Sequence, residues 1–304
     1  MNTSTKEKGT KRNPFVALVL SIAATGLGHV YCGKLTKGLI LFFISFAFAP
    51  IIVTGIQSMS STFSLILVIF SVLILVGVFI YAVIDAFFIA KRMDSPFVLK
   101  EFNRWYIYLL FIVVSISYPT NLSSNIRSHI IQAFTIPSAS MVPSILKGDY
   151  VLLNKFIYNT QSPQRGDVVV FVNPNDRHKN WIKRIVALPN DTIEIRNKVL
   201  FINDEPLAYR SISKTKLSII QDQITGSVVE EINGTTNYQI MLSNNSGANF
   251  RKMKVPNGHC FVLGDNRGNC EDSRHLGPIP LRDVMGRVDF IYLPAETWSR
   301  FGVF

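Results

Sequence analysis

A long apolar stretch occupies the N-terminal part of this chain of 304 residues and restricts its fold more than any other feature. Charged side chains are rare between residues 14 and 119, whereas the sequence beyond residue 120 has the mixed composition of a water-soluble domain. Four apolar segments make up the stretch, at residues 15–31, 37–56, 62–90 and 105–118. About 20 helical residues cross the apolar core of a bilayer, a length that the second and third segments reach. The sequence therefore predicts a membrane anchor followed by a soluble domain.

The positions of lysine and arginine predict how these segments cross the membrane. Basic residues at 34–37 and 91–104 are expected on the cytoplasmic side, and the uncharged residues 57–61 on the external side. The fourth segment, bordered by interfacial aromatic side chains and extended to residue 122, then carries the soluble domain outside. The basic N-terminus also favours the inside, so the first segment, which glycines interrupt, is predicted to form a re-entrant or interfacial hairpin. Three segments then span; the alternative is four spans with the N-terminus outside.

These boundaries divide the chain into four regions. Residues 1–13 are polar and basic and are expected to be disordered. A multi-helix membrane region (14–104), a transmembrane anchor (105–122) and the soluble domain (123–304) follow. Within the soluble domain, residues 208–255 are polar and irregular and are predicted to form an inserted β extension.

A short motif in the membrane region resembles the two-helix module of the TM2 family. It comprises Asn13-Pro14, Gly26-Leu27-Gly28-His29-Val30-Tyr31, Gly33 and Lys37-Gly38. The resemblance implies an accessory membrane module, and a plain anchor is the alternative.

The soluble domain is predicted to be mainly β. Short β-type segments alternate there with Gly, Pro, Asn and Asp, and no long amphipathic helical pattern appears. This pattern favours coiled antiparallel sheets. The expected strands are 150–156, 167–172, 182–188, 192–196, 199–202, 228–232, 238–242, 260–263 and 288–292.

Charge and cysteine content limit the partners. The net charge is +11, but the basic residues of the soluble domain are scattered, so a phospholipid membrane rather than nucleic acid is the expected partner. The spacing of Cys32, Cys260 and Cys270 relative to histidines does not suggest a metal site, and no metal or cofactor is predicted. Cys260 and Cys270 share the soluble domain and could pair in an oxidising compartment.

The stretch Phe134-Thr135-Ile136-Pro137-Ser138-Ala139-Ser140-Met141-Val142-Pro143-Ser144 contains the candidate nucleophiles. Pro137 and Pro143 restrict the backbone on both sides of Ser138 and Ser140 and favour an extended loop, on which a hydroxyl can be aimed. An ordinary Ser/Pro turn is the alternative interpretation.

A serine nucleophile needs a base, and the sequence leaves lysine as the remaining option. Gly-x-Ser-x-Gly is absent, no histidine lies in a nucleophile motif, and signatures of aspartic and metal proteases are missing. A lysine acts as a base only when neutral, and burial can lower its pKa from about 10.4 by roughly 3–5 units. Lys183 lies in an apolar, strand-like run, where Arg184 would point to the opposite, solvated face. A lysine that protects a sheet edge would show the same pattern.

Four stretches together resemble the bacterial type I signal peptidase family. They are Ile136-Pro137-Ser138-Ala139-Ser140-Met141 with Pro143-Ser144 and Gly148-Asp149; Arg165-Gly166-Asp167-Val168-Val169-Val170-Phe171; Ile182-Lys183-Arg184-Ile185-Val186-Ala187-Leu188-Pro189-Asn190-Asp191; and Gly264-Asp265-Asn266-Arg267 with Asp272-Ser273-Arg274 and Gly277. Their order along the chain matches that of the family's conserved boxes.

The resemblance implies a role for each matching residue. Ser140 is implied as the nucleophile and Lys183 as the general base, with the Ser138 hydroxyl and the Ser140 amide as oxyanion donors. Supporting roles are implied for Met141, Gly264, Asp265, Asn266, Cys270, Asp272, Ser273 and Arg274. Asp272 and Arg274 resemble the family's ion pair, while Gly264, Asp265 and Asn266 resemble its site-shaping turn.

The implied activity is a membrane-bound serine endopeptidase that removes signal peptides from exported preproteins after a small-x-small motif. It would act at the bacterial plasma membrane, with its catalytic domain on the extracytoplasmic side. Two residues depart from the pattern: Cys270 stands where the family often has a serine that contacts the lysine, and Gly268 where it often has Asp. A site position for Cys270 argues against a disulfide to Cys260.

Three other functions fit parts of the pattern. A self-cleaving repressor domain of the LexA type uses the same dyad but would need a DNA-binding domain in place of residues 1–119. A catalytically silent homologue and a protease dedicated to a single substrate are the other two.

Overall fold

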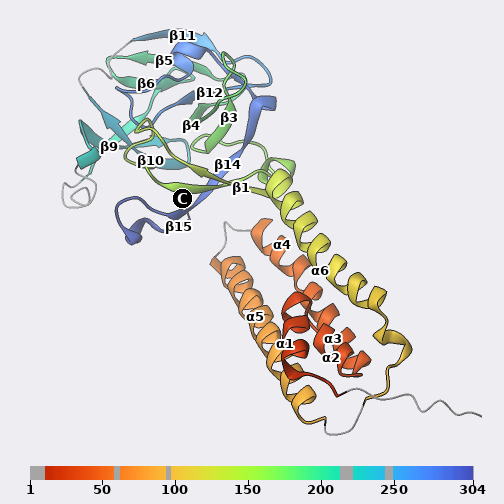
Figure 1. Ribbon diagram of the computed structural model, residues 1–304. Coiled ribbons are helices and arrows are strands. Elements are labelled where there is room, and N and C mark those ends of the chain that lie inside the picture. Colours follow the sequence, from red (N-terminus) through yellow and green to blue (C-terminus); the bar gives the residue numbers. More distant parts are fainter. Residues whose placement is uncertain (1–10, 58–61, 94–96, 213–221, 244–248, 304) are drawn as a thin grey trace, which may run out of the picture. The chain divides into compact units, whose positions relative to one another are not determined.

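The chain folds into two compact units, Met1–Ser128 and His129–Phe304 (Figure 1). The computed structural model describes residues 11–57, 62–93, 97–212, 222–243 and 249–303. Residues 1–10 of the predicted disordered N-terminus and 58–61 of the predicted external link lie outside these ranges. The second unit begins at His129 rather than at the predicted residue 123, because a helix and a π-helical turn continue past that position.

Helices make up the first unit. They are α1 (Pro14–Ala23), α2 (Leu27–Tyr31), α3 (Leu35–Ala47), α4 (Ala49–Gln57), α5 (Thr62–Lys91), the short η1 (Glu101–Asn103), α6 (Trp105–Asn125) and the π-turn η2 (Ile126–Ile130). Within the described residues, three stretches are long and apolar enough to cross a membrane, namely Leu35–Gly55, Ile66–Lys91 and Trp105–Ile130.

The first predicted apolar segment consists of two short helices that meet at Gly26. Asn13 caps α1, because its side chain accepts a hydrogen bond from the amide of Phe15 at 2.9 Å. Gly26 has a φ of 88°, and a Cβ there would lie 2.2 Å from the carbonyl oxygen of Gly38. With 10 residues, α1 is too short to cross a bilayer alone.

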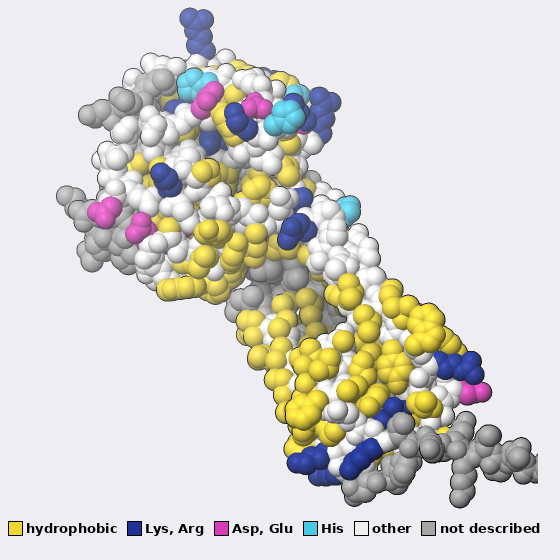
Figure 2. Space-filling model, viewed as in Figure 1, with side chains coloured by type: hydrophobic (Ala, Val, Ile, Leu, Met, Phe, Trp, Pro, Cys, Tyr) yellow, Lys and Arg dark blue, Asp and Glu magenta, His cyan; other side chains and the backbone are white. Residues whose placement is uncertain are grey.

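The surface of the helical unit is apolar. Phe43, Phe70 and Leu73 are each at least 60% exposed, and Figure 2 shows apolar side chains spread over these helices with basic ones gathered at one end. Such a surface is far larger than the apolar patches of soluble monomers, so it fits a hydrocarbon environment.

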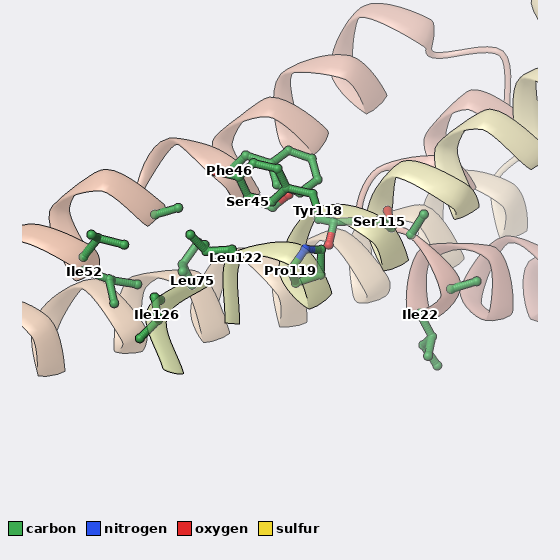
Figure 3. Close-up of a pocket in the computed structure, with 15 residues that line it drawn as sticks. Ile22, Ser45, Phe46, Ile52, Leu75, Ser115, Tyr118, Pro119, Leu122 and Ile126 are labelled. Carbon is green, nitrogen blue, oxygen red and sulfur yellow. The ribbon is translucent and has the colours of Figure 1, made fainter. Parts of the chain in front are cut away.

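The helical unit contains a cluster of polar side chains and a cavity. Asp85 Oδ2 on α5 lies 2.7 Å from both His29 Nε2 on α2 and Lys37 Nζ on α3. A cavity of about 380 Å³ lies among the helices, and Tyr118 and Pro119 of α6 lie beside Phe46 on its wall (Figure 3). The polar cluster ties α2 and α3 to α5.

The second unit consists of three antiparallel sheets with small helices, and this confirms the predicted mainly β class. The largest sheet has the order β1-β2-β14-β3-β4-β12-β13, with β15 on β14. Its strands are β1 (Ile131–Thr135), β2 (Tyr150–Asn154), β3 (Val168–Val172), β4 (Asn180–Ala187), β12 (His259–Leu263), β13 (Ile279–Pro280), β14 (Val284–Leu293) and β15 (Gly302–Val303). The small helices are η3 (Ile157–Asn159), α7 (Ser273–Leu276), η7 (Leu281–Asp283) and η8 (Trp298–Arg300).

Residues 213–221 and 244–248 of the predicted extension at 208–255 lie outside the described ranges, and the strands of its described part are divided between the two smaller sheets. One sheet has the order β10-β9-β8, and the other β11-β5-β6-β7. Thus β11 joins strands from outside the extension, because it pairs with β5. These strands are β5 (Thr192–Arg196), β6 (Val199–Ile202), β7 (Glu205–Pro206), β8 (Ala208–Ser211), β9 (Ser227–Asn233), β10 (Thr236–Leu242) and β11 (Phe250–Lys254).

Apolar side chains of β2, β3 and β4 fill the core next to the loop that follows β1. Met141, Ile145 and Leu153 are fully buried there, together with Val168 and Ile182. This packing fixes the start of the Ser/Pro loop against the strand that carries Lys183.

Candidate active site

The loop after β1 and the strand β4 bring Ser140 and Lys183 together. Lys183 Nζ lies 3.0 Å from Ser140 Oγ, within hydrogen-bond distance, and 2.8 Å from the carbonyl oxygen of Ile182. Strand β4 is paired on both sides, with β3 and β12, so the backbone of Lys183 is held firmly. A nucleophile and a base at this distance form the minimum set for covalent acyl transfer.

Lys183 is buried, and its surroundings favour the neutral amine. The residue is 4% exposed, and its Nζ lies 5.6 Å from the centre of the Trp181 ring. Burial lowers the pKa of Lys183 below its usual value, although the carboxylates of Asp272 and Asp265 oppose this shift. When the ammonium of Lys183 loses a proton, the neutral amine that results can accept one from a hydroxyl.

Ser138 lies beside the nucleophile. Its Oγ is 3.2 Å from Ser140 Oγ, in the exposed part of the loop. The next two residues, Met141 and Val142, are fully buried, so the loop is anchored just after Ser140. The loop therefore presents two hydroxyls at the surface from a backbone that is fixed in the core.

The turn Gly264–Arg267 lies against the backbone of the nucleophile. The amide of Asn266 donates to the carbonyl oxygen of Ser140 at 3.1 Å, and its side-chain amide donates to that of Ala139 at 3.2 Å. Gly264 leaves no room for a side chain, because a Cβ would lie 2.7 Å from the Ser140 carbonyl oxygen and 2.4 Å from Cys270 Sγ. These contacts fix the position of the Ser140 backbone relative to β4.

Asp265 pairs with Arg184, the residue that follows Lys183. Its carboxylate accepts two hydrogen bonds from Arg184, at 2.8 Å and 2.7 Å. Arg184 is 5% exposed, so the prediction that it points to solvent is wrong. The strand meets the turn 264–267 on the side where Arg184 projects, and the bidentate pair compensates the buried charge.

Asp272 forms the second buried ion pair of the site. Its two carboxylate oxygens accept from Arg274 Nε and Nη2, both at 2.8 Å, and Oδ2 also accepts from the amide of Gly264 at 3.1 Å. Burial raises the pKa of Asp272, but Arg274 outweighs it and keeps that pKa below its usual value. Ser273 is buried and accepts from the amide of Val262 at 3.0 Å.

Cys270 lies in the site but hydrogen-bonds to Asp272, with Sγ 2.6 Å from Oδ2. Burial, together with that carboxylate, raises the pKa of its thiol to about 12. Cys260 and Cys270 are both free, so they do not form the disulfide considered from the sequence.

The dyad opens onto a cleft of about 860 Å³. Pro137, Ser138 and Ser140 form one part of its lining, and the start of β4 and the segment 268–271 form others. Gly268 and Cys270, the two departures from the family pattern, both line this cleft.

Sequence reasoning missed two residues that hold the site from a distance, Glu231 and Tyr238. Glu231 on β9 forms a buried pair with Arg267, and Tyr238 on β10 donates to the same carboxylate at 2.8 Å. The signal was weak, because Glu231 lies in a segment that reads as polar and irregular. The adjacent pair Glu230-Glu231 gives no local hint that one member is fully buried.

Comparisons with known proteins identify one family. A family model described as "Signal peptidase, peptidase S26" matches residues 103–293. A signal peptidase I from Pseudomonas fluorescens is 32% identical over 237 residues, which cover 69% of this chain and 77% of the relative. One from Aquifex aeolicus is 33% identical over 205 residues, covering 57% and 80%. A crystal structure of a signal peptidase I from Enterococcus faecalis V583 covers 42% of this chain and 97% of that chain, at 28% identity and a TM-score of 0.27.

Proposed function

The chain belongs to the signal peptidase family, peptidase S26, and on that premise we propose that it cleaves signal peptides with a dyad of Ser140 and Lys183. The family makes the chain a serine peptidase whose substrates are preproteins. The distance of 3.0 Å between Lys183 Nζ and Ser140 Oγ, with Lys183 buried, carries the assignment of the dyad.

In each half of the proposed reaction, Lys183 accepts one proton and then returns it. Neutral Lys183 accepts the proton of Ser140 Oγ while this oxygen attacks the carbonyl carbon of the scissile peptide bond. When the tetrahedral intermediate collapses, the carbon–nitrogen bond breaks, and Lys183 returns the proton to the leaving amine. Lys183 then accepts a proton from water while the water oxygen attacks the ester carbonyl carbon. When this second intermediate collapses, the ester carbon–oxygen bond breaks, Lys183 returns the proton to Ser140 Oγ, and the signal peptide leaves with a free carboxyl group.

The oxyanion of the intermediate is assigned to two donors on the loop, the Ser138 hydroxyl and the Ser140 amide. Support comes from the position of Ser138 Oγ, 3.2 Å from Ser140 Oγ and directed to the open side of the loop. Removal of one such donor typically costs about 10²–10³-fold in rate.

The supporting residues are proposed to orient the dyad rather than to react. Met141 anchors the loop in the core, Gly264 and Asn266 contact the backbone at Ser140, and Asp265 holds Arg184. Cys270 lines the cleft with Lys183 and is linked through Asp272 to Arg274, while Ser273 binds the backbone of β12 at Val262.

The proposed cleavage motif is small-x-small, with the preprotein extended along the cleft. Extended peptides bind readily beside sheet edges, where their main chain can pair. The apolar helices support a membrane-bound enzyme with several spans and an external catalytic unit. Because substrate and enzyme would lie in the same bilayer, their encounter is favoured by high effective concentration.

The direct test is cleavage of an Ala-x-Ala preprotein in detergent by the full chain and three variants. Ser140→Ala and Lys183→Met should abolish cleavage, and Ser138→Ala should reduce kcat by about 10²–10³-fold while leaving some activity. Circular dichroism of each variant checks that it remains folded.

Each outcome separates one assignment from the others. Cleavage by Lys183→Met would mean that another group is the base, and a Ser138→Ala variant as fast as wild type would remove Ser138 from the oxyanion site. A folded wild type that leaves several preproteins intact would favour a silent homologue or a dedicated substrate.

A further inference from the structure

We infer that the β9–β10 hairpin is a positioning element of the active site and that Glu231 acts on the dyad through Arg267. The inference rests on the proposed function, since the dyad of Ser140 and Lys183 defines what is positioned. It gives a role to part of the polar segment that the sequence predicted to be an inserted β extension.

The first step is the contact between the hairpin and the turn that holds Ser140. Strand β10 and this turn are joined by two backbone hydrogen bonds, from the amide of Met241 to the carbonyl oxygen of Asp265 at 2.8 Å and from the amide of Arg267 to that of Met241 at 2.9 Å. Asn266 lies between these bonds and donates to the carbonyl oxygen of Ser140. The position of β10 is therefore transmitted to the nucleophile through a single residue.

The second step is the ion pair between Arg267 and Glu231, which fixes the turn 264–267. Arg267 donates to the two carboxylate oxygens of Glu231 at 2.8 Å and 2.6 Å, and its Nε donates to the carbonyl oxygen of Gly264 at 3.2 Å. The side chains of Arg267 and Glu231 are 6% and 0% exposed. Few relative orientations of the two side chains allow both hydrogen bonds of a buried bidentate pair. The carboxylate therefore determines where the guanidinium and the Gly264 carbonyl lie.

The third step extends the hairpin to the strand of the base. Tyr238 donates to Glu231, and its ring lies 4.2 Å from the guanidinium carbon of Arg184. The side-chain amide of Asn233 donates to the carbonyl oxygen of Val186 on β4 at 2.9 Å. The hairpin therefore contacts both the turn behind Ser140 and the strand that carries Lys183.

Energetics favour positioning over stabilisation as the reason for this pair. Removing both charges from water costs several kcal/mol per ion, and apolar residues of similar size often replace such a pair without loss of stability. A displacement of about 1 Å in an active site, by contrast, can reduce the rate by 10²-fold.

The test uses the full chain in detergent and compares two neighbouring glutamates. Glu231→Gln should lower kcat by about tenfold or more, with KM within twofold of wild type. Glu230→Gln is the matched control, because Glu230 lies on the same strand, pairs with the 70% exposed Arg210, and should leave kcat unchanged. Hydrogen exchange by mass spectrometry should show faster exchange of residues 136–146 in Glu231→Gln only.

A double variant separates positioning from a structural role. Glu231→Leu with Arg267→Met removes both charges, so it should unfold near the wild-type temperature while kcat stays low and exchange of 136–146 stays fast. If this variant regains wild-type kcat, the pair only supports the fold and the inference is overturned. This variant also carries the test if Glu231→Gln does not fold.

The exchange measurement keeps this inference separate from the proposed function. If wild type cleaves no preprotein, the proposed function fails, but faster exchange of residues 136–146 in Glu231→Gln would still support the mechanical link. Unchanged exchange in both Glu231 variants would contradict the link whether or not the enzyme is active.

Discussion

Two adjacent basic residues on β4 have opposite electrostatic environments. Lys183 hydrogen-bonds to a hydroxyl and a carbonyl oxygen, whereas Arg184 pairs with the carboxylate of Asp265. Burial lowers the pKa of Lys183; burial also opposes the charge of Arg184, but Asp265 raises the pKa of Arg184 above its usual value. One strand thereby places a lysine with a lowered pKa next to a permanent cation.

The lowered pKa of Lys183 predicts how stability depends on pH. Between the pKa of folded Lys183 and the unfolded value of about 10.4, the unfolded chain binds more protons, so the free energy of unfolding rises with pH. One such group contributes at most about 1.4 kcal/mol per pH unit. Lys183→Met removes this contribution, so its stability advantage over wild type should shrink as pH rises from 7 to 10. Urea unfolding of both proteins at several pH values measures the difference.

Lys179→Met is the control for that experiment. Its hydrogen bond to Asp176 raises the pKa of Lys179, so any contribution of this pair is present below the unfolded pKa and is lost as pH rises. The difference between Lys179→Met and wild type should thus stay nearly constant from pH 7 to 10 and change only above that range. A Lys183→Met advantage that stays constant over this range would contradict a buried, neutral lysine.

At the residue scale, motifs in sequence named the candidate dyad and the ion pair of Asp272 with Arg274, but not the buried pairs that join distant parts of the chain. Ser140 and Lys183 belong to contiguous boxes, so local pattern was enough to single them out. The pairs Arg184–Asp265 and Glu231–Arg267 join residues far apart in the chain, and burial decides their role. A period-2 pattern assigned Arg184 to solvent because it cannot show that both faces of β4 are covered.

At the scale of elements, the loop after the nucleophile is closed by the C-terminal segment. The buried carboxylate of Asp149 accepts from the amide of Leu146 at 2.7 Å and from the amide of Ala295 at 2.9 Å. Arg300, at the end of η8, donates to both of its oxygens at 2.8 Å and to the carbonyl oxygen of Ser144 at 3.1 Å. The last residues of the chain therefore stabilise the loop that carries the nucleophile.

Arg300→Met should destabilise the protein strongly. The substitution leaves the carboxylate of Asp149 buried without its cation, a change that typically costs about 3–5 kcal/mol. Thermal unfolding of the full chain in detergent should therefore show a clearly lower Tm. Arg210→Met is the matched control: its partner Glu230 is near the surface, so its loss should cost at most about 1 kcal/mol. Equal Tm values for the two variants would show that Asp149 does not depend on Arg300.

Most strands followed from sequence because their apolar residues alternate between turn signals. The segments 192–196 and 199–202 match β5 and β6, and others differ by a few residues at their ends. Several strands were not among the expected segments, and β1 and β11 are the longest of them. The first follows the helix directly and has an apolar composition that fits the membrane boundary, while the second is mostly exposed and polar.

At the scale of the whole molecule, composition divided the chain into an apolar helical part and a β part. A membrane helix can be apolar on every side, whereas a water-soluble domain needs polar residues on its surface. The two parts therefore differ in composition, and the division is visible in the sequence. The number of spans is harder to predict, because α1 and α2 are apolar but short. The break at Gly26, where only glycine fits against Gly38, distinguishes a hairpin from one long helix.

A reporter fused at residue 5 tests this topology. With three spans and an external catalytic unit, the N-terminus lies on the cytoplasmic side, so a reporter that is active only in the cytoplasm should be active there and inactive when fused after residue 304. The physical reason is the length of α1, whose 10 residues are half of what a bilayer needs. Three spans place the two ends on opposite sides. If both fusions read external, the number of spans is even, and α1 with α2 must form a fourth crossing.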